Sequence, residues 1–149
     1  MDITIFPRKL SGTIEAIPSK SQAHRILICA AFSDKPTAIR CPATNHDIDA
    51  TVDCLNALGA KIVNACDGFL VTPVQAIPSS AVLNCRESGA TLRFMLPICA
   101  ALGVDATFLM AGRLPSRPLS PLWEELTAKG CVLSRPDAST IRCQGKLQS

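Results

Sequence analysis

A cluster of hydroxyl and basic side chains stands at the start of a predicted helix near the beginning of the chain. The segment is Ser19-Lys20-Ser21-Gln22-Ala23-His24-Arg25, and the apolar run Ile26 to Phe32 follows it. Ser19 is a suitable N-cap, and the first turn of a helix favours an anion through its unpaired N–H groups and partial positive charge. Basic residues there oppose the helix dipole unless an anion binds, so the cluster predicts an anion site. Taken alone, the segment also fits a simpler interpretation, in which Lys20 and Arg25 are solvated surface charges.

Two segments in the second half of the chain combine the same residue types. Glu87-Ser88-Gly89-Ala90-Thr91-Leu92-Arg93 stands at the start of another predicted helix, and Gly112-Arg113-Leu114-Pro115-Ser116-Arg117-Pro118 forms a loop before a further one. A glycine lets a ligand approach the backbone, and guanidinium groups bind carboxylate and phosphate through paired hydrogen bonds. The segments therefore predict a ligand with carboxylate or phosphate groups. Either loop arginine alone, Arg113 or Arg117, is explained as well or better by hydrogen bonds to backbone carbonyls.

Two stretches of the chain resemble each other at an offset of about seventy residues. Ile28-Cys29-Ala30-Ala31 recurs as Ile98-Cys99-Ala100-Ala101, and Thr37-Ala38-Ile39 is echoed by Thr107-Phe108-Leu109. A fixed offset favours a duplicated structural unit, although apolar helices also resemble one another by chance. Because the anion-binding motifs fall at equivalent places in the two stretches, we predict that the chain contains two copies of one unit.

Hydrophobic periodicity and turn residues predict the same order of elements in each unit. The predicted helices span residues 20–32, 47–58, 89–102 and 118–129. The predicted strands span residues 13–17, 36–41, 61–64, 69–72, 81–84, 105–110, 132–134 and 140–143. Pro118 suits the first position of the last helix, while Gly59 and Gly130 suit the turn after a helix. The order is β-α-β-α-β-β, repeated, which predicts an α/β fold with helices covering sheets.

Composition excludes several classes of protein. The 149 residues carry a formal net charge of +3, with 48% hydrophobic and 4% aromatic residues. This mild charge and the scarcity of aromatic side chains argue against nucleic-acid binding. No apolar run is long enough to span a bilayer, and the N-terminus lacks a signal-peptide pattern. We therefore expect a globular, cytoplasmic protein with no membrane partner and small anionic ligands.

The eight cysteines do not have the spacing of a metal site. No two of them are separated by two to four residues, and only two histidines accompany them. Zinc sites usually need such close pairs, and a disulfide framework is typical of secreted domains. Several of the cysteines, such as Cys29 and Cys99, lie in apolar patterns. We predict reduced thiols buried in the core, and no bound metal.

The three motifs together resemble a known family. Ser19-Lys20-Ser21-x-x-His24-Arg25, Glu87-Ser88-Gly89-x-Thr91-Leu92-Arg93-Phe94 and Gly112-Arg113-Leu114-Pro115-x-Arg117-Pro118-Leu119 are similar, in order and approximate spacing, to the 5-enolpyruvylshikimate-3-phosphate (EPSP) synthases. The sister family, the UDP-N-acetylglucosamine enolpyruvyl transferases, shares the architecture and stays as an alternative. That family has a Lys-Asn pair in place of Lys20-Ser21, and its loop cysteine has no match in this chain.

The resemblance implies the enolpyruvyl transferase fold, an inside-out α/β barrel. In that fold each of two domains contains three β-α-β-α-β-β units, and helix N-termini point into the cleft between the domains. On this basis residues 1–17 correspond to N-terminal strands partly shared with the other domain. Residues 18–80 form the first unit and residues 81–149 the second. The third unit and the second domain are absent from these 149 residues.

The resemblance also implies an activity and a set of site residues. The family transfers the carboxyvinyl group of phosphoenolpyruvate to the 5-hydroxyl of shikimate 3-phosphate and releases phosphate, with no metal or organic cofactor. Lys20 would be catalytic and would contact both substrates, and Asp47 would be a carboxylate near the cleft. The resemblance assigns Lys20, Ser21 and Arg25 to shikimate 3-phosphate. It assigns Lys20, Gly89, Arg93 and Arg117 to phosphoenolpyruvate.

Two departures from the family pattern limit these expectations. Ala90 replaces a hydroxyl residue beside the phosphoenolpyruvate site, and no general base is evident in the chain, although His24 and His46 are chemical candidates. We therefore expect a fragment that is inactive alone and prone to self-association, from a monomeric parent enzyme. Alternatives from other classes are a non-catalytic module that binds phosphate or carboxylate, and a nucleic-acid-associated protein.

Overall fold

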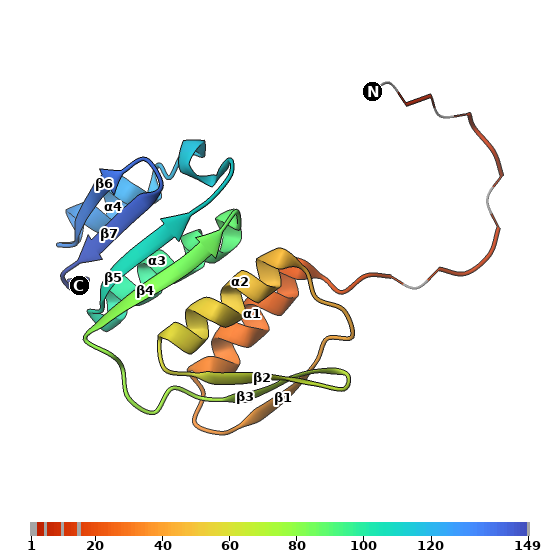
Figure 1. Cartoon of the computed structure of the whole chain (residues 1–149), viewed down its shortest axis with the longest axis horizontal. Helices are drawn as coiled ribbons and strands as arrows, with labels where there is room; N and C mark the ends of the chain where they lie inside the picture. The colour runs from red at the N-terminus through yellow and green to blue at the C-terminus, as the bar shows by residue number, and fades with distance from the viewer. Residues whose placement is uncertain (1–2, 5, 10, 15, 149) are drawn as a thin grey trace.

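A computed structural model of the chain describes residues 3–4, 6–9, 11–14 and 16–148. The described residues form two sheets with helices packed against them (Figure 1). The helices are α1 (Lys20–Ala31), α2 (His46–Ala57), α3 (Gly89–Leu102) and α4 (Leu122–Ala128), with a 3₁₀ turn η1 at Leu114–Ser116. The strands are β1 (Thr37–Arg40), β2 (Lys61–Ala65), β3 (Gly68–Thr72), β4 (Ser80–Arg86), β5 (Asp105–Met110), β6 (Val132–Asp137) and β7 (Thr140–Gln144). The predicted α/β class is confirmed.

The two sheets have related topologies. The first has the order β1-β3-β2, and both of its pairings are antiparallel. The second has the order β4-β5-β7-β6, in which β4 and β5 are parallel and the other pairs are antiparallel. Without β4, the order β5-β7-β6 repeats β1-β3-β2. The helix α3 connects the two parallel strands, as a parallel pair requires a crossover.

A continuous apolar core joins the two halves of the molecule. Helix α2 contacts β2 of the first sheet and β4 of the second, and it also packs against α1 and α3. Its buried side chains include Ile48 and Leu55, while Leu83 of β4 and Met95 of α3 are fully buried in the same cluster. Because α2 takes part in both halves, the N-termini of the first three helices are held in one rigid arrangement.

Most of the predicted elements are confirmed, and two require correction. Helix α4 begins at Leu122 rather than near Pro118, because Pro121 disfavours helical geometry at the residue before it and offers no N–H to an earlier turn. The strand expected at residues 13–17 is not formed by the described residues Thr13, Ile14, Ala16 and Ile17. An isolated extended segment has no neighbouring strand to pair with, and the described part of it runs away from the sheets (Figure 1).

The cysteines are free, and most of them lie in the core. The buried ones are Cys41, Cys54, Cys85, Cys99, Cys131 and Cys143. The prediction of buried thiols is wrong for Cys29 and Cys66, which are exposed. Cys29 lies on the outer side of α1 despite its apolar sequence neighbours, and Cys66 lies in the turn between β2 and β3. Among the described residues, no helix is long and apolar enough to cross a membrane.

Candidate functional site

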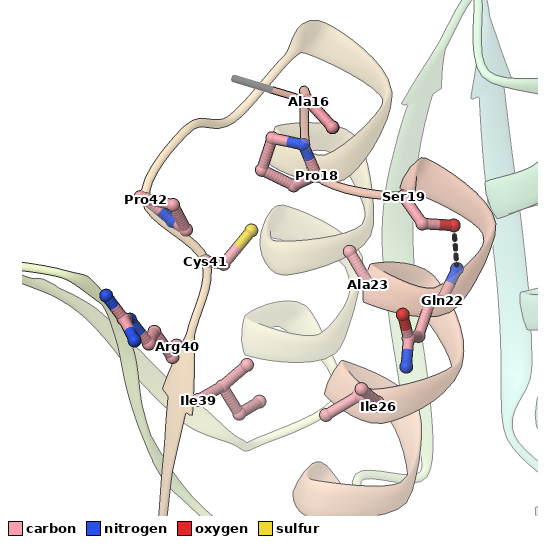
Figure 2. Close-up of a pocket in the computed structure, with 10 residues that line it drawn as sticks. All are labelled: Ala16, Pro18, Ser19, Gln22, Ala23, Ile26, Ile39, Arg40, Cys41 and Pro42. Atoms are coloured by element: carbon pink, nitrogen blue, oxygen red, sulfur yellow. Dashed lines mark hydrogen bonds between the residues drawn. The ribbon is translucent and has the colours of Figure 1, made fainter. Parts of the chain in front are cut away.

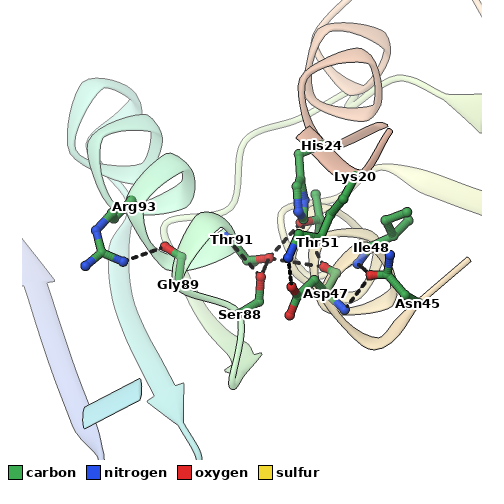
Figure 3. Close-up of polar contacts among 10 residues, drawn as sticks. All are labelled: Lys20, His24, Asn45, Asp47, Ile48, Thr51, Ser88, Gly89, Thr91 and Arg93. Atoms are coloured by element: carbon green, nitrogen blue, oxygen red, sulfur yellow. Dashed lines mark hydrogen bonds and ion pairs between the residues drawn. The ribbon is translucent and has the colours of Figure 1, made fainter. Parts of the chain in front are cut away.

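The N-termini of α1, α2 and α3 meet at one place in the molecule. Each helix has a side-chain cap that accepts a hydrogen bond from the backbone of its first turn: Ser19 for α1, Asn45 for α2 and Ser88 for α3. The Asn45 cap accepts from two N–H groups, those of Asp47 and Ile48, at 3.0 and 3.1 Å. Side chains from all three first turns touch one another (Figure 3). The arrangement concentrates three partial positive charges at one surface, which suits an anionic ligand.

Lys20 forms an ion pair with Asp47 across α1 and α2. The Lys20 Nζ lies 2.6 Å from Asp47 Oδ2, and the two side chains are 50% and 30% exposed. The hydrogen bond from Lys20 holds the pKa of the Asp47 carboxyl below its usual value, against the opposing effect of burial. Both residues line an open pocket of about 410 Å³ together with Asn45, His46 and Glu87. The ammonium group is therefore positioned at the helix junction while remaining accessible to a ligand.

Arg25 extends the basic surface from α1 toward α3. Its Nη1 donates to the backbone carbonyl of Ser21 at 2.7 Å, and its guanidinium carbon lies 5.1 Å from the ring centre of Phe94. This stacking on an aromatic face restrains the guanidinium while leaving its outer edge free for hydrogen bonds. Lys20, Ser21 and Arg25 thus lie on one end of α1, as the sequence predicts.

Gly89, Arg93 and Arg117 form a second basic cluster, at the start of α3. A Cβ placed on Gly89 would lie 2.7 Å from Arg93 Nη1 and 3.2 Å from Arg117 Nη1, so the backbone of Gly89 directly faces both guanidinium groups. Arg93 donates to the carbonyl of Gly89 at 3.1 Å (Figure 3). It also donates to the carbonyl of Pro118 at 2.7 Å. The side chain of Arg117 makes no hydrogen bond or ion pair with any described residue. Its donors are therefore available to a ligand.

Glu87 holds the arginine loop against α3. Its Oε1 accepts a hydrogen bond from the backbone N–H of Arg113 at 2.9 Å. Gly112 has a positive φ of 53°, and a Cβ at that position would overlap the Glu87 carboxylate. The loop is thus fastened at its beginning by Glu87 and at its end by the bond from Arg93 to Pro118. Arg113 contributes its backbone to this arrangement, whereas Arg117 contributes its side chain.

A buried polar network lies directly beneath the Lys20–Asp47 pair. Thr51 of α2 and Thr91 of α3 join through their hydroxyl oxygens at 2.8 Å, and Thr91 donates to Ser88 Oγ at 2.7 Å. His24 of α1 meets Thr51 through Nδ1 at 2.7 Å. All four residues are buried. The network links the three helix starts through side chains rather than through packing alone.

Sequence reasoning missed the role of Thr51. Among the residues of α2, the apolar Val52 is only half-buried, whereas the polar Thr51 is fully buried. The available signal was the position of Thr51 three residues after Ile48 and four before Leu55, within a helical stripe that faces the core. A threonine at such a place needs a polar partner, and that partner lies forty residues away in α3.

The two histidines have different environments. His24 is fully buried, and burial lowers its pKa despite the nearby Asp47 carboxylate. Its ring therefore does not contact a ligand in the pocket and is not a general base there. His46 is exposed at the rim of the pocket. Within the described residues, no group of three or more His, Cys, Asp or Glu side chains is arranged to hold a metal ion.

A separate pocket of about 340 Å³ lies beside α1 but away from the predicted site residues (Figure 2). Its lining is mainly apolar, with Ile26 and Ala23 of α1 facing Ile39 and Cys41 across the pocket. The charged residue at its edge is Arg40. It offers no cluster of anion-binding groups, so we place the candidate site at the helix junction rather than here.

Comparison with known proteins identifies the family that this chain resembles. Residues 6–136 match the family model described as EPSP synthase (3-phosphoshikimate 1-carboxyvinyltransferase). The chain is 33% identical over 157 aligned positions to the 3-phosphoshikimate 1-carboxyvinyltransferase of Clostridium beijerinckii, covering 99% of this chain and 36% of that protein. It is 34% identical to the protein of that name from Clostridium botulinum (strain Alaska E43), covering 97% of this chain and 35% of the relative. The chain thus spans about a third of the length of these curated relatives.

Solved structures show the same fold. The chain resembles EPSP synthase from Acinetobacter baumannii with a TM-score of 0.76 and 19% identity, over 92% of this chain and 32% of that one. It is also similar to the enolpyruvyl transferase NikO from Streptomyces tendae, with a TM-score of 0.53 and 18% identity, over 88% and 31% of the two chains. These likenesses confirm the predicted enolpyruvyl transferase fold. Together with the family-model match over residues 6–136, they show that this chain belongs to the EPSP synthase family.

Proposed function

We propose that the chain forms the N-terminal part of a 3-phosphoshikimate 1-carboxyvinyltransferase. In this proposal the complete protein transfers the carboxyvinyl group of phosphoenolpyruvate to the 5-hydroxyl of shikimate 3-phosphate and releases phosphate. One observation carries the proposal: the backbone of Gly89 faces the guanidinium groups of Arg93 and Arg117, with no side chain between them. Two guanidiniums at a helix N-terminus suit a small ligand that carries both carboxylate and phosphate.

The proposal gives each basic cluster one substrate. Gly89, Arg93 and Arg117 receive phosphoenolpyruvate, and Ser21 and Arg25 hold the carboxylate of shikimate 3-phosphate. Lys20 is the catalytic residue of this chain and contacts both substrates. Two observations support this role of Lys20. It lies at the helix junction, and its ion pair with Asp47 fixes the ammonium group without burying it. Holding two anions in reacting geometry contributes about 7–11 kcal/mol in favourable cases.

The proposal also assigns the parts of the complete enzyme. Residues 18–80 and 81–149 are two of its β-α-β-α-β-β units, and residues 1–17 join the sheet of the other domain. Since Asp47 is ion-paired and His24 is buried, the general acid and base come from outside this chain. The isolated chain is accordingly inactive and self-associates through apolar surface, whereas the complete enzyme is a cytoplasmic monomer. The free cysteines are consistent with a reducing compartment.

Calorimetric titration of the chain with phosphoenolpyruvate at low ionic strength tests the site. Arg117→Gln removes the unpaired guanidinium, and we expect the affinity to fall by about tenfold or more because a charge-assisted hydrogen bond contributes about 1.5–3 kcal/mol. Arg142→Gln is the matched control, since Arg142 is an exposed arginine on β7 and makes the same change in net charge. Equal losses in the two variants would show non-specific charge attraction and contradict the proposal.

A second experiment tests the activity itself. The complete coding sequence should direct phosphate release from the two substrates, and Lys20→Ala should abolish it. The 149-residue chain alone should release no phosphate. If the complete protein binds phosphoenolpyruvate but releases no phosphate, the proposal of an enzyme is wrong and the protein is a non-catalytic anion-binding module.

A further inference from the structure

His24 has one hydrogen-bond partner and one unsatisfied ring nitrogen. Its Nδ1 lies 2.7 Å from Thr51 Oγ1. Its Nε2 is buried and has no partner among the residues that the structure describes. The ring is fully enclosed, with Phe94 at a centroid distance of 6.3 Å. The environment therefore distinguishes the two neutral tautomers of this histidine.

The unsatisfied nitrogen favours one tautomer. If Nε2 carried the proton, a buried N–H donor would remain unpaired, and unpaired buried donors are rarer in proteins than unpaired acceptor lone pairs. If Nδ1 carries the proton, it donates to Thr51 Oγ1 and only a lone pair stays unsatisfied at Nε2. The neutral Nδ1–H form of His24 is thus the one that the site accommodates, and Thr51 is its acceptor.

That choice of tautomer determines the direction of the whole network. A hydroxyl group has a single proton, and the nearest acceptor for the proton of Thr51 is Thr91 Oγ1 at 2.8 Å, closer than the Asp47 backbone carbonyl at 3.4 Å. Thr91 in turn donates to Ser88 Oγ at 2.7 Å. The Asp47 carbonyl also lies 3.3 Å from the Thr91 hydroxyl, so the chain of hydrogen bonds passes directly beside the residue paired with Lys20. Asp47 also accepts from Lys20 Nζ at 2.6 Å.

We propose that His24 is a positioning residue, whose Nδ1–H starts a one-directional hydrogen-bond chain through Thr51 and Thr91 to Ser88. This chain surrounds the backbone carbonyl of Asp47 and so fixes the helix turn that carries the partner of Lys20. The chain of donors crosses from α1 to α2 and to α3, so it also fixes the three helix starts relative to one another. The effect of this network on catalysis rests on the proposed function of Lys20, but the direction of the hydrogen bonds does not depend on that function.

The first test reads the tautomer in the unaltered chain. In two-bond ¹⁵N–¹H spectra of ¹⁵N-histidine-labelled protein at neutral pH, His24 should show a protonated Nδ1 and an unprotonated Nε2. His46, which is exposed, serves as an internal reference in the same spectrum. A protonated Nε2, or a mixture of tautomers at His24, would overturn the proposal without any variant being made.

The second test compares Thr51→Val with Thr51→Ser. Valine removes the hydroxyl with little change in shape, so His24 should become a mixture of tautomers, while serine should retain the Nδ1–H form.

The control is Thr127→Val on α4, where the hydroxyl donates to the carbonyl of Trp123 away from the network. It should leave the His24 tautomer unchanged. A merely structural role for Thr51 would lower the free energy of unfolding and leave the His24 tautomer unchanged in Thr51→Val, which would contradict the proposal. Should no variant bind phosphoenolpyruvate, the proposed function would fail while these readouts still decide the hydrogen-bond direction.

Discussion

The two sheets of this chain repeat one strand order but differ at a single edge. In the second sheet β5 is paired on both sides, by β4 and β7, whereas within the described residues its counterpart β1 in the first sheet is paired only by β3. The pocket beside Ile39 and Cys41 lies along this less complete part of the first half. The basic residues of the two halves also differ, in the number of contacts that hold them. Arg93 is fastened to two backbone carbonyls, while Lys20 depends on one partly exposed ion pair. The half of the chain with the extra strand is thus also the half whose basic residue has more hydrogen-bond partners.

Truncating the buried Leu83 side chain of β4 should produce the largest change in stability. Leu83 is fully buried between β4 and the helices, and Leu83→Ala should lower the free energy of unfolding by about 2–5 kcal/mol, because it leaves a cavity in the shared core. Val82, the preceding residue, is 60% exposed on the opposite face. Val82→Ala should change stability by about 0.5 kcal/mol or less in the same urea titration. Similar losses in both variants would mean that β4 does not anchor the second half.

Adding one methyl group at Gly89 tests the cluster of Arg93 and Arg117. Gly89→Ala forces its Cβ against Arg93 and Arg117, so phosphoenolpyruvate affinity should fall by at least about tenfold, or about 1.4 kcal/mol. Alanine is a better helix former than glycine, so the free energy of unfolding should not decrease from the backbone change. Titration calorimetry and urea unfolding of the same preparation separate the two effects. A large loss of stability with unchanged affinity would assign Gly89 to packing alone.

The smallest effect is expected for the Lys20–Asp47 pair in the first half, and it should appear in the pH dependence of the free energy of unfolding. The folded-state pKa of Asp47 is lowered, chiefly by Lys20, so its contribution is present above the unfolded pKa of about 3.9 and is lost as pH falls through the folded value. Asp47→Asn should therefore destabilise the chain by about 1 kcal/mol or less at pH 6, and the difference from the unaltered chain should shrink below pH ~4.

Asp34→Asn is the matched control for that titration, because Asp34 is exposed and forms no ion pair with a described residue. It should leave the acid branch of the stability curve unchanged. A difference between the unaltered chain and Asp47→Asn that stays constant from pH 6 to pH 3 would mean that the Lys20 pair does not stabilise the folded state.

Local signals in the sequence were sufficient for the helices and for most of the site. Ser19 caps α1 as predicted, because capping depends on residues within one turn. The family resemblance implied a common site for Gly89, Arg93 and Arg117, whereas local signals covered only Gly89 and Arg93 at the start of α3, because Arg117 lies in the loop before α4. The partnership of Thr51 with Thr91 was not, because it depends on how α2 packs against α3. The exposure of Cys29 was missed for a related reason: apolar neighbours in sequence do not decide which side of a helix faces the core.

The distribution of the cysteines has a practical consequence for spectroscopy. Cys29 on α1 and Cys66 in the β2–β3 turn are exposed, whereas Cys99 and Cys143 are buried with pKa values raised to about 12 and about 11. Thiolates are the reactive form, so maleimide dyes should label the first two while the chain is folded and reach the buried thiols only on unfolding. The first half of the sequence therefore already contains two labelling positions, one for a donor dye and one for an acceptor dye. Distances between α1 and the first sheet can be followed during folding without introducing any new residue.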